Sequence, residues 1–214
     1  MSVEILDESY DININELDLS GREISELPES IGELVNLKEL CLGYNQLSEL
    51  PKSIGNLVNL TYLDLSHNQL QVIPESIGKL INLQYLHLYF NQLTIIPEST
   101  GKLVNLKELY LYNNQLKNLP ESIGKLVKLE ELVLYNNRLT NLPTSILNIK
   151  NSLTVYDSYE INNLSPDTEF LIFSYLDEEL TNLPTGLKEI WIRERTKNEK
   201  LNHKLPFGCV IKYF

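Results

Sequence analysis

The sequence predicts an α/β solenoid built on a parallel β-sheet, and three regularities lead to that fold. Proline, glycine and asparagine each recur every 23 residues, and one Leu-x-Leu segment falls within each period. The proline column is Pro28, Pro51, Pro74, Pro97, Pro120, Pro143 and Pro166, and the glycine column is Gly32, Gly55, Gly78, Gly101 and Gly124. Because three residue types stay in phase, one supersecondary unit is repeated along the chain.

Each period contains one short strand. Successive side chains of a strand point to opposite faces, so Leu40 and Leu42 face a core while Glu39, Cys41 and Gly43 face away from it. One strand of roughly three to five residues in every period places successive strands side by side in a parallel sheet.

The stretch that returns to the next strand predicts a short helical or 3₁₀ turn. Ile31, Leu34 and Leu37 are spaced three residues apart, which is the period of a 3₁₀ helix. Pro28 suits the first turn because its missing N–H has no helical partner there. Gly32 weakens a regular α-helix, so we expect irregular turns on the convex side of the stack.

The repeated unit resembles the leucine-rich-repeat family. Five segments fit the pattern L-x-x-L-x-L-x-x-N-x-L, namely residues 37–47, 60–70, 83–93, 106–116 and 129–139. The half that reads LP-x-S-I-G-x-L is similar to the intracellular, Ras-group type of these repeats. The resemblance implies a curved horseshoe with its sheet on the concave face, and scaffolding or signalling partners.

The amino-acid composition gives an indication of the kind of genome that encodes this chain. The chain has 23 Asn, 12 Tyr and no Ala. This enrichment, with truncated repeats at the end of the chain, is similar to repeat proteins from AT-rich genomes, including giant viruses of amoebae.

We expect a single solenoid over residues 1–214, with different ends. Residues 1–26 form an acidic N-terminal cap and a degenerate first repeat, and residues 27–149 form five regular repeats and the start of a sixth. Residues 150–214 form shorter, degenerate repeats and a C-terminal cap. Caps are required because one repeat cannot bury its apolar face alone.

The asparagine column predicts a hydrogen-bonded ladder. Its amides have donors and acceptors that can satisfy turn backbone in the adjacent repeat. Arg22 occupies the position one period earlier, so we expect the ladder to end there. Replacing Asn91 by leucine is expected to cost about 1–3 kcal/mol. The column comprises Asn45, Asn68, Asn91, Asn114 and Asn137.

Aromatic side chains gather at outward-facing positions of successive strands. Such positions align into columns about 4.8 Å apart, so we expect one surface open to solvent across four strands. Tyrosine presents a large area with a polar tip, and large exposed apolar patches mark binding sites. We favour a protein-binding surface over a mere preference of tyrosine for strands. The predicted partner-binding residues are Tyr62, Asp64, Tyr85, His87, Tyr89, Phe90, Tyr110, Tyr112 and Tyr135, with Glu39, Glu108 and Glu131 in an acidic rim that also holds Glu16 and Asp18.

Charge and hydropathy restrict the partners. The net charge of −11 argues against nucleic acid and anionic membranes, which require basic surfaces, and favours a protein or peptide with basic residues. The basic segment Lys188–Lys204 leaves nucleic-acid binding as a weaker alternative. The chain lacks a long apolar run and an export signal, so we expect an intracellular, cytoplasmic monomer (in the host cytoplasm if viral) with Cys41 and Cys209 reduced.

Catalytic and metal-binding motifs are absent from the sequence. It has no phosphate-binding glycine loop, H-E-x-x-H, nucleophile elbow or paired-cysteine metal spacing, so we expect no cofactor and no metal. His87 and Asp64 are neighbours that can pair, which we interpret as a surface hydrogen bond. Cys41 has no basic neighbour to lower its pKa. The sequence therefore favours a non-enzymatic interaction module or scaffold; the alternative is a substrate-recognition arm of a ligase or other enzyme complex.

Overall fold

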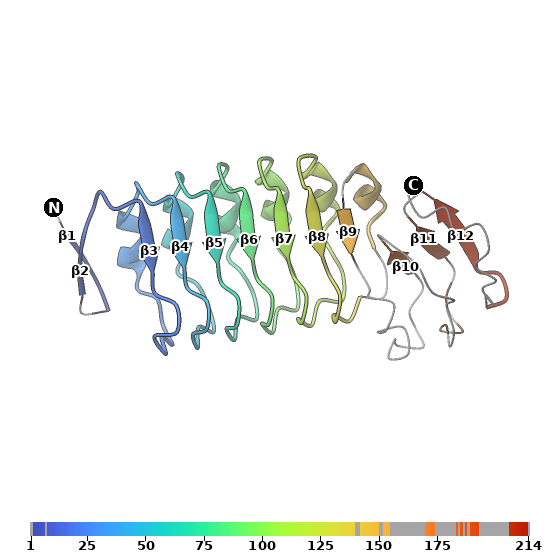
Figure 1. Ribbon diagram of the computed structural model, residues 1–214, viewed down its shortest axis with the longest axis horizontal. Coiled ribbons are helices and arrows are strands. Elements are labelled where there is room, and N and C mark those ends of the chain that lie inside the picture. Colours follow the sequence, from blue (N-terminus) through green and yellow to red (C-terminus); the bar gives the residue numbers. More distant parts are fainter. Residues whose placement is uncertain are drawn as a thin grey trace.

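A computed structural model confirms the expected solenoid. Seven parallel strands, β3 to β9, form one sheet in chain order, and 3₁₀ helices alternate with them on the opposite side (Figure 1). The structure describes residues 2–6, 8–139, 142–149, 152–154, 170–173, 183, 185, 187, 189–192 and 206–213. The basic segment Lys188–Lys204 and the proline position Pro166 lie largely or wholly outside these residues.

Every regular repeat supplies one three-residue strand and one five-residue 3₁₀ helix. The strands are β3 (Glu16–Asp18), β4 (Glu39–Cys41), β5 (Tyr62–Asp64), β6 (Tyr85–His87), β7 (Glu108–Tyr110), β8 (Glu131–Val133) and β9 (Ser152–Thr154). The helices are η1 (Glu29–Glu33), η2 (Lys52–Asn56), η3 (Glu75–Lys79), η4 (Glu98–Lys102), η5 (Glu121–Lys125) and η6 (Thr144–Asn148).

The register of the sheet reproduces the sequence period. Leu63 pairs with Leu86, and the same 23-residue offset holds from β3 to β8. The offset shortens between β8 and β9, where Glu131 pairs with Ser152. Equivalent positions therefore stand directly beside one another across the regular repeats.

The 3₁₀ helices refine two expectations about proline and glycine. Pro28 lies just before η1 with an extended backbone, and its carbonyl accepts from the Ile31 amide, so proline caps the helix rather than occupying its first turn. A Cβ on Gly78 would lie 2.6 Å from the Ser99 carbonyl oxygen. Glycine is therefore required by the close approach of neighbouring 3₁₀ helices, rather than by its effect on α-helix propensity alone.

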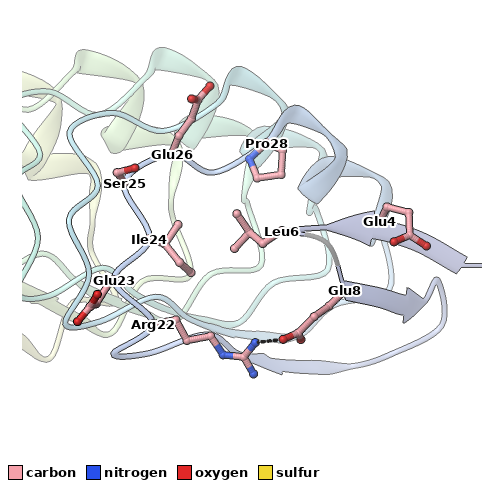
Figure 2. Close-up of a pocket in the computed structure, with 9 residues that line it drawn as sticks. All are labelled: Glu4, Leu6, Glu8, Arg22, Glu23, Ile24, Ser25, Glu26 and Pro28. Carbon is pink, nitrogen blue, oxygen red and sulfur yellow. Dashed lines mark hydrogen bonds and ion pairs between the residues drawn. The ribbon is translucent and has the colours of Figure 1, made fainter.

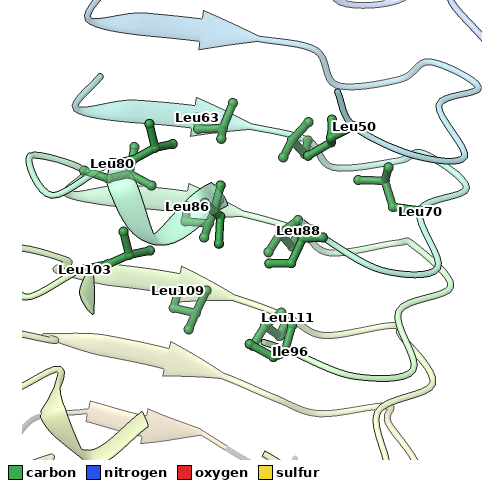
Figure 3. Packing of buried hydrophobic residues seen from close by; sticks show 14 of the residues in the cluster. Leu50, Leu63, Leu70, Leu80, Leu86, Leu88, Ile96, Leu103, Leu109 and Leu111 are labelled. Carbon is green, nitrogen blue, oxygen red and sulfur yellow. The ribbon is translucent and has the colours of Figure 1, made fainter. Parts of the chain in front are cut away.

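The core is a continuous stack of leucine and isoleucine between the sheet and the helices (Figure 3). Each repeat adds a layer; the layer between positions 73 and 93 consists of Ile73, Ile77, Leu80, Leu83, Leu86, Leu88 and Leu93, all buried. The isoleucine of the 3₁₀ helix is replaced in η4 by Thr100, which is fully buried. Its hydroxyl has no hydrogen-bond partner among the residues that the structure describes.

The ends depart from the repeat. The N-terminal cap is an antiparallel hairpin of β1 (Ser2–Ile5) and β2 (Glu8–Asp11), which buries Val3 and Ile5 against the first repeats. Near the C-terminus, β10 (Phe170–Phe173), β11 (Glu189–Ile192) and β12 (Val210–Tyr213) form a second parallel sheet. All three strands fall within residues 150–214, where shorter, degenerate repeats are expected.

Candidate aromatic binding surface

The parallel register assembles the predicted aromatic columns. Tyr62 pairs with Tyr85 in neighbouring strands, and His87 lies between Asp64 and Tyr110. Further rings follow strands β4 to β8 at the second or third position after the last strand residue. We call the combined set the aromatic array; it comprises Tyr44, Tyr62, His67, Tyr85, His87, Tyr89, Phe90, Tyr110, Tyr112 and Tyr135.

Two stacks of parallel rings form the part of the array just beyond the strands. Tyr89, Tyr112 and Tyr135 stack with both centroid separations at 4.6 Å. Tyr44, His67 and Phe90 form the second stack. These separations match the spacing of adjacent strands, so the sheet itself sets the distance between rings.

The two stacks also contact each other edge to face. The centroids of His67 and Tyr89 are 5.5 Å apart at 86°, and those of Phe90 and Tyr112 are 5.8 Å apart at 76°. Aromatic pairs favour this edge-to-face arrangement as well as the offset stack. The rings thus brace one another into a single preformed surface.

The second stack is held by an unusual backbone. The residue before each ladder asparagine lies in the left-handed region, with φ of 57° at Tyr44 and 52° at both His67 and Phe90. The same position is Gly21, Asn113 or Asn136 elsewhere, residue types that tolerate this conformation better. In three successive repeats, an aromatic residue therefore occupies a position whose positive φ strains the backbone of a residue with a side chain.

His87 lies at the centre of the strand-borne rings. Its ring stacks on Tyr110 with centroids 4.7 Å apart, and its Nδ1 lies 3.3 Å from the Tyr62 hydroxyl. Its Nε2 faces the Glu108 carboxylate at 3.7 Å. Asp64 instead accepts a hydrogen bond from the Ser66 amide. The expected pair of His87 with Asp64 is therefore wrong; Tyr62 and Glu108 are its neighbours.

The acidic residues do not all lie at a rim. Glu108 is half-buried beside His87, and Glu131 accepts a hydrogen bond from the Tyr110 hydroxyl. Glu16, Asp18 and Glu39 are exposed on β3 and β4, next to the N-terminal end of the array. The surface is therefore acidic at one end and has carboxylates set among its rings at the other.

Burial and these carboxylates keep the hydroxyl and thiol groups protonated. Burial, with the nearby Asp64 charge, raises the pKa of Tyr62 to about 12, and burial raises the pKa of Tyr112 to about 12. Burial raises the pKa of Cys41 to about 11, assisted by Asp18, Asp64 and Glu39. A thiol with this pKa carries almost no thiolate at neutral pH, so Cys41 is unsuited to act as a nucleophile.

The array is less open than the sequence suggests. The stacked rings cover one another, so most of the predicted aromatic residues are half-buried and Phe90 alone among them is exposed. Tyr44, at the outer end of its stack, is 63% exposed. Tyr44 and His67 were absent from the predicted site, although they share the sequence column of Phe90, and that column was the signal for them.

Each ladder asparagine comes directly after the chain position that carries the second stack. The Asn91 Nδ2 donates to the Leu65 carbonyl at 2.9 Å and the Leu88 carbonyl at 3.1 Å, while Oδ1 accepts from the Leu70 amide at 3.0 Å. Each therefore joins its own repeat to the preceding one. The same pattern recurs at Asn45, Asn68, Asn114 and Asn137.

A hollow of about 890 Å³ lies elsewhere, between the N-terminal hairpin and the first repeat (Figure 2). Glu4, Glu23 and Glu26 are among its lining residues, and Arg22 crosses its edge to form an ion pair with Glu8 at 2.7 Å. The hollow is thus a seam between the cap and the solenoid, and it is lined by residues other than those of the aromatic array.

Metal-binding clusters and membrane-spanning helices are both missing from the described residues. No group of three or more His, Cys, Asp or Glu side chains among them is arranged to hold a metal ion. No helix in this part of the chain is long and apolar enough to cross a bilayer.

Comparison with known families agrees with the repeat pattern. A family model described as a leucine-rich repeat region matches residues 13–92 and 73–205, which together cover most of the chain. No curated protein matches the sequence.

Solved structures of similar fold are numerous, and three illustrate their range. A leucine-rich-repeat protein of Leptospira interrogans has a TM-score of 0.65 and 34% identity, over 85% of this chain and 50% of its own. The plant peptide hormone receptor RGFR1 in complex with RGF2 has a TM-score of 0.55 and 26% identity, over 87% of this chain and 30% of its own. The ectodomain of the Arabidopsis thaliana receptor kinase GASSHO1/SCHENGEN3, in complex with CASPARIAN STRIP INTEGRITY FACTOR 2, has a TM-score of 0.55 and 29% identity, over 79% and 23%. This chain spans half or less of each of them.

Proposed function

Because this chain belongs to the leucine-rich-repeat family, we propose that it is an interaction module or scaffold that binds a protein or peptide on its aromatic array. Two of the similar structures are plant receptors in complex with RGF2 and with CASPARIAN STRIP INTEGRITY FACTOR 2. Those ligands belong to the receptors, and they support only the general use of the fold for binding.

The observation that carries the proposal is the preformed stacking of the array. Ten rings from five successive repeats are held at fixed separations by the sheet register and by mutual stacking. Rigid aromatic side chains lose little entropy on binding and are enriched at the centres of protein interfaces. An array that folds in advance therefore presents contact area without a large ordering cost.

Charge selects the kind of partner. Glu16, Asp18 and Glu39 are exposed beside the array, and Asp64 and Glu108 lie within it. Complementary charge accelerates association and excludes unsuitable partners. We therefore infer a partner segment that carries lysine or arginine. A cytoplasmic location and a monomeric state fit this function and belong to the same proposal.

The chemistry of the surface supports binding rather than catalysis. The Cys41 thiol is protonated because burial and three carboxylates raise its pKa to about 11. His87 is enclosed by Tyr62 and Tyr110 and faces Glu108, and within the described part of the chain it contacts no second histidine or nucleophile. We infer that the array acts without a cofactor or metal.

The proposal can be tested by selecting ligands from a random peptide library on the immobilised protein. We expect enrichment of peptides that contain arginine or lysine, and at least tenfold weaker binding of those peptides to the double variant Tyr85→Ala/Tyr112→Ala. The proposal would be contradicted if the selected peptides bound the double variant with unchanged affinity.

A matched control separates loss of contact from loss of folding. Val72 and Ile95 are exposed at equivalent positions outside the array, so Val72→Ala/Ile95→Ala should leave peptide binding unchanged. Thermal unfolding of both double variants checks that the solenoid persists. Equal loss of binding in the two variants would attribute the effect to something other than the array.

A further inference from the structure

A second surface lies on the turns that lead from each 3₁₀ helix into the next strand. One aliphatic side chain in every regular repeat is exposed there, at the same position of the 23-residue period. The exposed fractions run from 42% to 63% in a row that we call the aliphatic stripe, comprising Val35, Val58, Ile81, Val104 and Val127. In the aromatic array, by contrast, the rings lie on the strands or just after them.

The backbone of the stripe is rigidly turned. The residue before each stripe position has a φ near −79° and a ψ between 54° and 59°, the geometry of an inverse γ-turn. In the third repeat the Ile81 amide donates to the Lys79 carbonyl at 2.9 Å, and Val104 and Val127 donate in the same way to Lys102 and Lys125. The turn therefore fixes an aliphatic side chain two residues after a lysine.

A second row of asparagines ties neighbouring stripe positions together. The Asn82 Nδ2 donates to the Val58 carbonyl at 2.9 Å, and the Asn105 Nδ2 donates to the Ile81 carbonyl at 2.8 Å. Lys128 takes the next position of this row and donates to the Asn105 side chain. The stripe is thus held in register from repeat to repeat, like the array but by separate contacts.

The charge beside the last three stripe positions is opposite to that of the array, whereas the equivalent position is Glu33 beside Val35 and Asn56 beside Val58. Lys79, Lys102 and Lys125 are exposed in the last position of η3, η4 and η5. Among the described residues, none of these three lysines forms an ion pair. An apolar row with unpaired positive charges along one side fits a ligand that is apolar on one face and acidic next to it.

The spacing of adjacent repeats in the sheet is close to one turn of an α-helix. Neighbouring repeats lie about 4.8 Å apart in the sheet, and an α-helix advances ~5.4 Å per turn. A helix laid along the stripe places one apolar side chain against each repeat, whereas same-face side chains of an extended strand recur every ~6.6 Å. Five repeats span about 19 Å between the first and last positions, the length of roughly 13 helical residues.

We propose that the aliphatic stripe binds an acidic amphipathic helix of a partner protein, with the helix lying across the repeats and its carboxylates against Lys79, Lys102 and Lys125. This surface is separate from the aromatic array, so the protein has two binding faces of opposite charge preference. A scaffold of this kind joins a basic segment on one face to an acidic helix on the other.

The test uses a helix-stabilised synthetic peptide of about 16 residues, ~24 Å long, with leucine on one face and glutamate elsewhere. We expect it to bind the full chain in fluorescence anisotropy, and Ile81→Ser/Val104→Ser/Val127→Ser to weaken binding at least tenfold. Lys79→Glu/Lys102→Glu/Lys125→Glu should have a similar effect, and a peptide with lysine in place of glutamate should restore its binding. All substituted side chains are exposed, so both triple variants should unfold at temperatures close to that of the original protein.

Controls distinguish this proposal from other occupants and from the aromatic array. Val72→Ser/Ile95→Ser and Tyr85→Ala/Tyr112→Ala should both leave binding of the acidic peptide unchanged. Failure of the peptide to bind, or equal loss in the Val72/Ile95 control, would overturn the proposal. Binding to anionic vesicles without binding to the peptide would also overturn the proposal, because it assigns the stripe to a lipid surface. Self-association that the aliphatic triple variant abolishes would do so too, because it assigns the stripe to a second copy of the chain.

Discussion

Replacing Asn91 by leucine removes one rung of the buried ladder. The side chain is 8% exposed, and its three shortest hydrogen bonds join main-chain groups, the Leu65 and Leu88 carbonyls and the Leu70 amide. Leucine is similar in size but offers neither a donor nor an acceptor. The substitution therefore leaves these groups without their partner inside the protein.

The three hydrogen bonds set the size of the effect. A buried main-chain group that loses its partner costs about 1–3 kcal/mol, and water that reaches the edge of the ladder recovers part of this. We expect a loss of about 3–5 kcal/mol, above the 1–3 kcal/mol that the repeat pattern alone suggests. For a chain of this size, that corresponds to a fall of roughly 6–20 °C in Tm.

The matched control is Asn82→Leu, which changes the exposed row of asparagines in the same way. Asn82 makes one hydrogen bond, to the Val58 carbonyl, and water can replace it, so we expect a loss below about 1 kcal/mol. Thermal and urea unfolding, followed by circular dichroism, measure both variants. A Tm for Asn91→Leu no lower than that of Asn82→Leu would refute the reasoning.

Three further outcomes are expected. Thr100→Ile restores the isoleucine found at this position in the other regular repeats and removes a buried hydroxyl without a hydrogen-bond partner in the described part of the chain. It should therefore stabilise the protein by about 1–2 kcal/mol in thermal unfolding, and a lower Tm would contradict this. Gly78→Ala places a Cβ 2.6 Å from the Ser99 carbonyl oxygen and should lower stability by about 1–3 kcal/mol, whereas an unchanged Tm would show that the helices separate without cost. Alkylation of Cys41 by iodoacetamide, followed by mass spectrometry of its peptide, should rise with a midpoint near pH 11, because burial and neighbouring carboxylates disfavour the thiolate. Asp64→Asn removes one of these charges and should lower that midpoint; a midpoint that rises or stays fixed would be inconsistent with the assigned cause.

The fold could be predicted because the signal is repeated. Leu40 and Leu42 carry only a weak indication of a strand by themselves, but the same pattern in five repeats at constant spacing predicts a parallel sheet and its register. The aromatic columns followed from that register, since equivalent residues of adjacent repeats must lie side by side. Tyr85 and Tyr112 could therefore be assigned to one surface before any coordinate was known.

Contacts between columns could not be predicted in the same way. His87 was expected to pair with Asp64, its neighbour in one column, but it faces Glu108 from a different column. Side-chain direction decides such contacts, and the repeat period carries no information on it. The aliphatic stripe could not be predicted for a related reason, because Ile81 directly follows the buried Leu80 and its exposure depends on the inverse γ-turn at that leucine.

By itself, the sequence determined that this chain is a stack of 23-residue units and which residues share a column, because a regular period maps directly onto a regular solenoid. Only the tertiary structure decided how the columns meet. Stacking half-buries the rings of the array and places Glu108 against His87, and the turn after η3 sets Ile81 two residues beyond the exposed Lys79. These outcomes depend on backbone turns and side-chain directions between repeats, which are set when the repeats pack together.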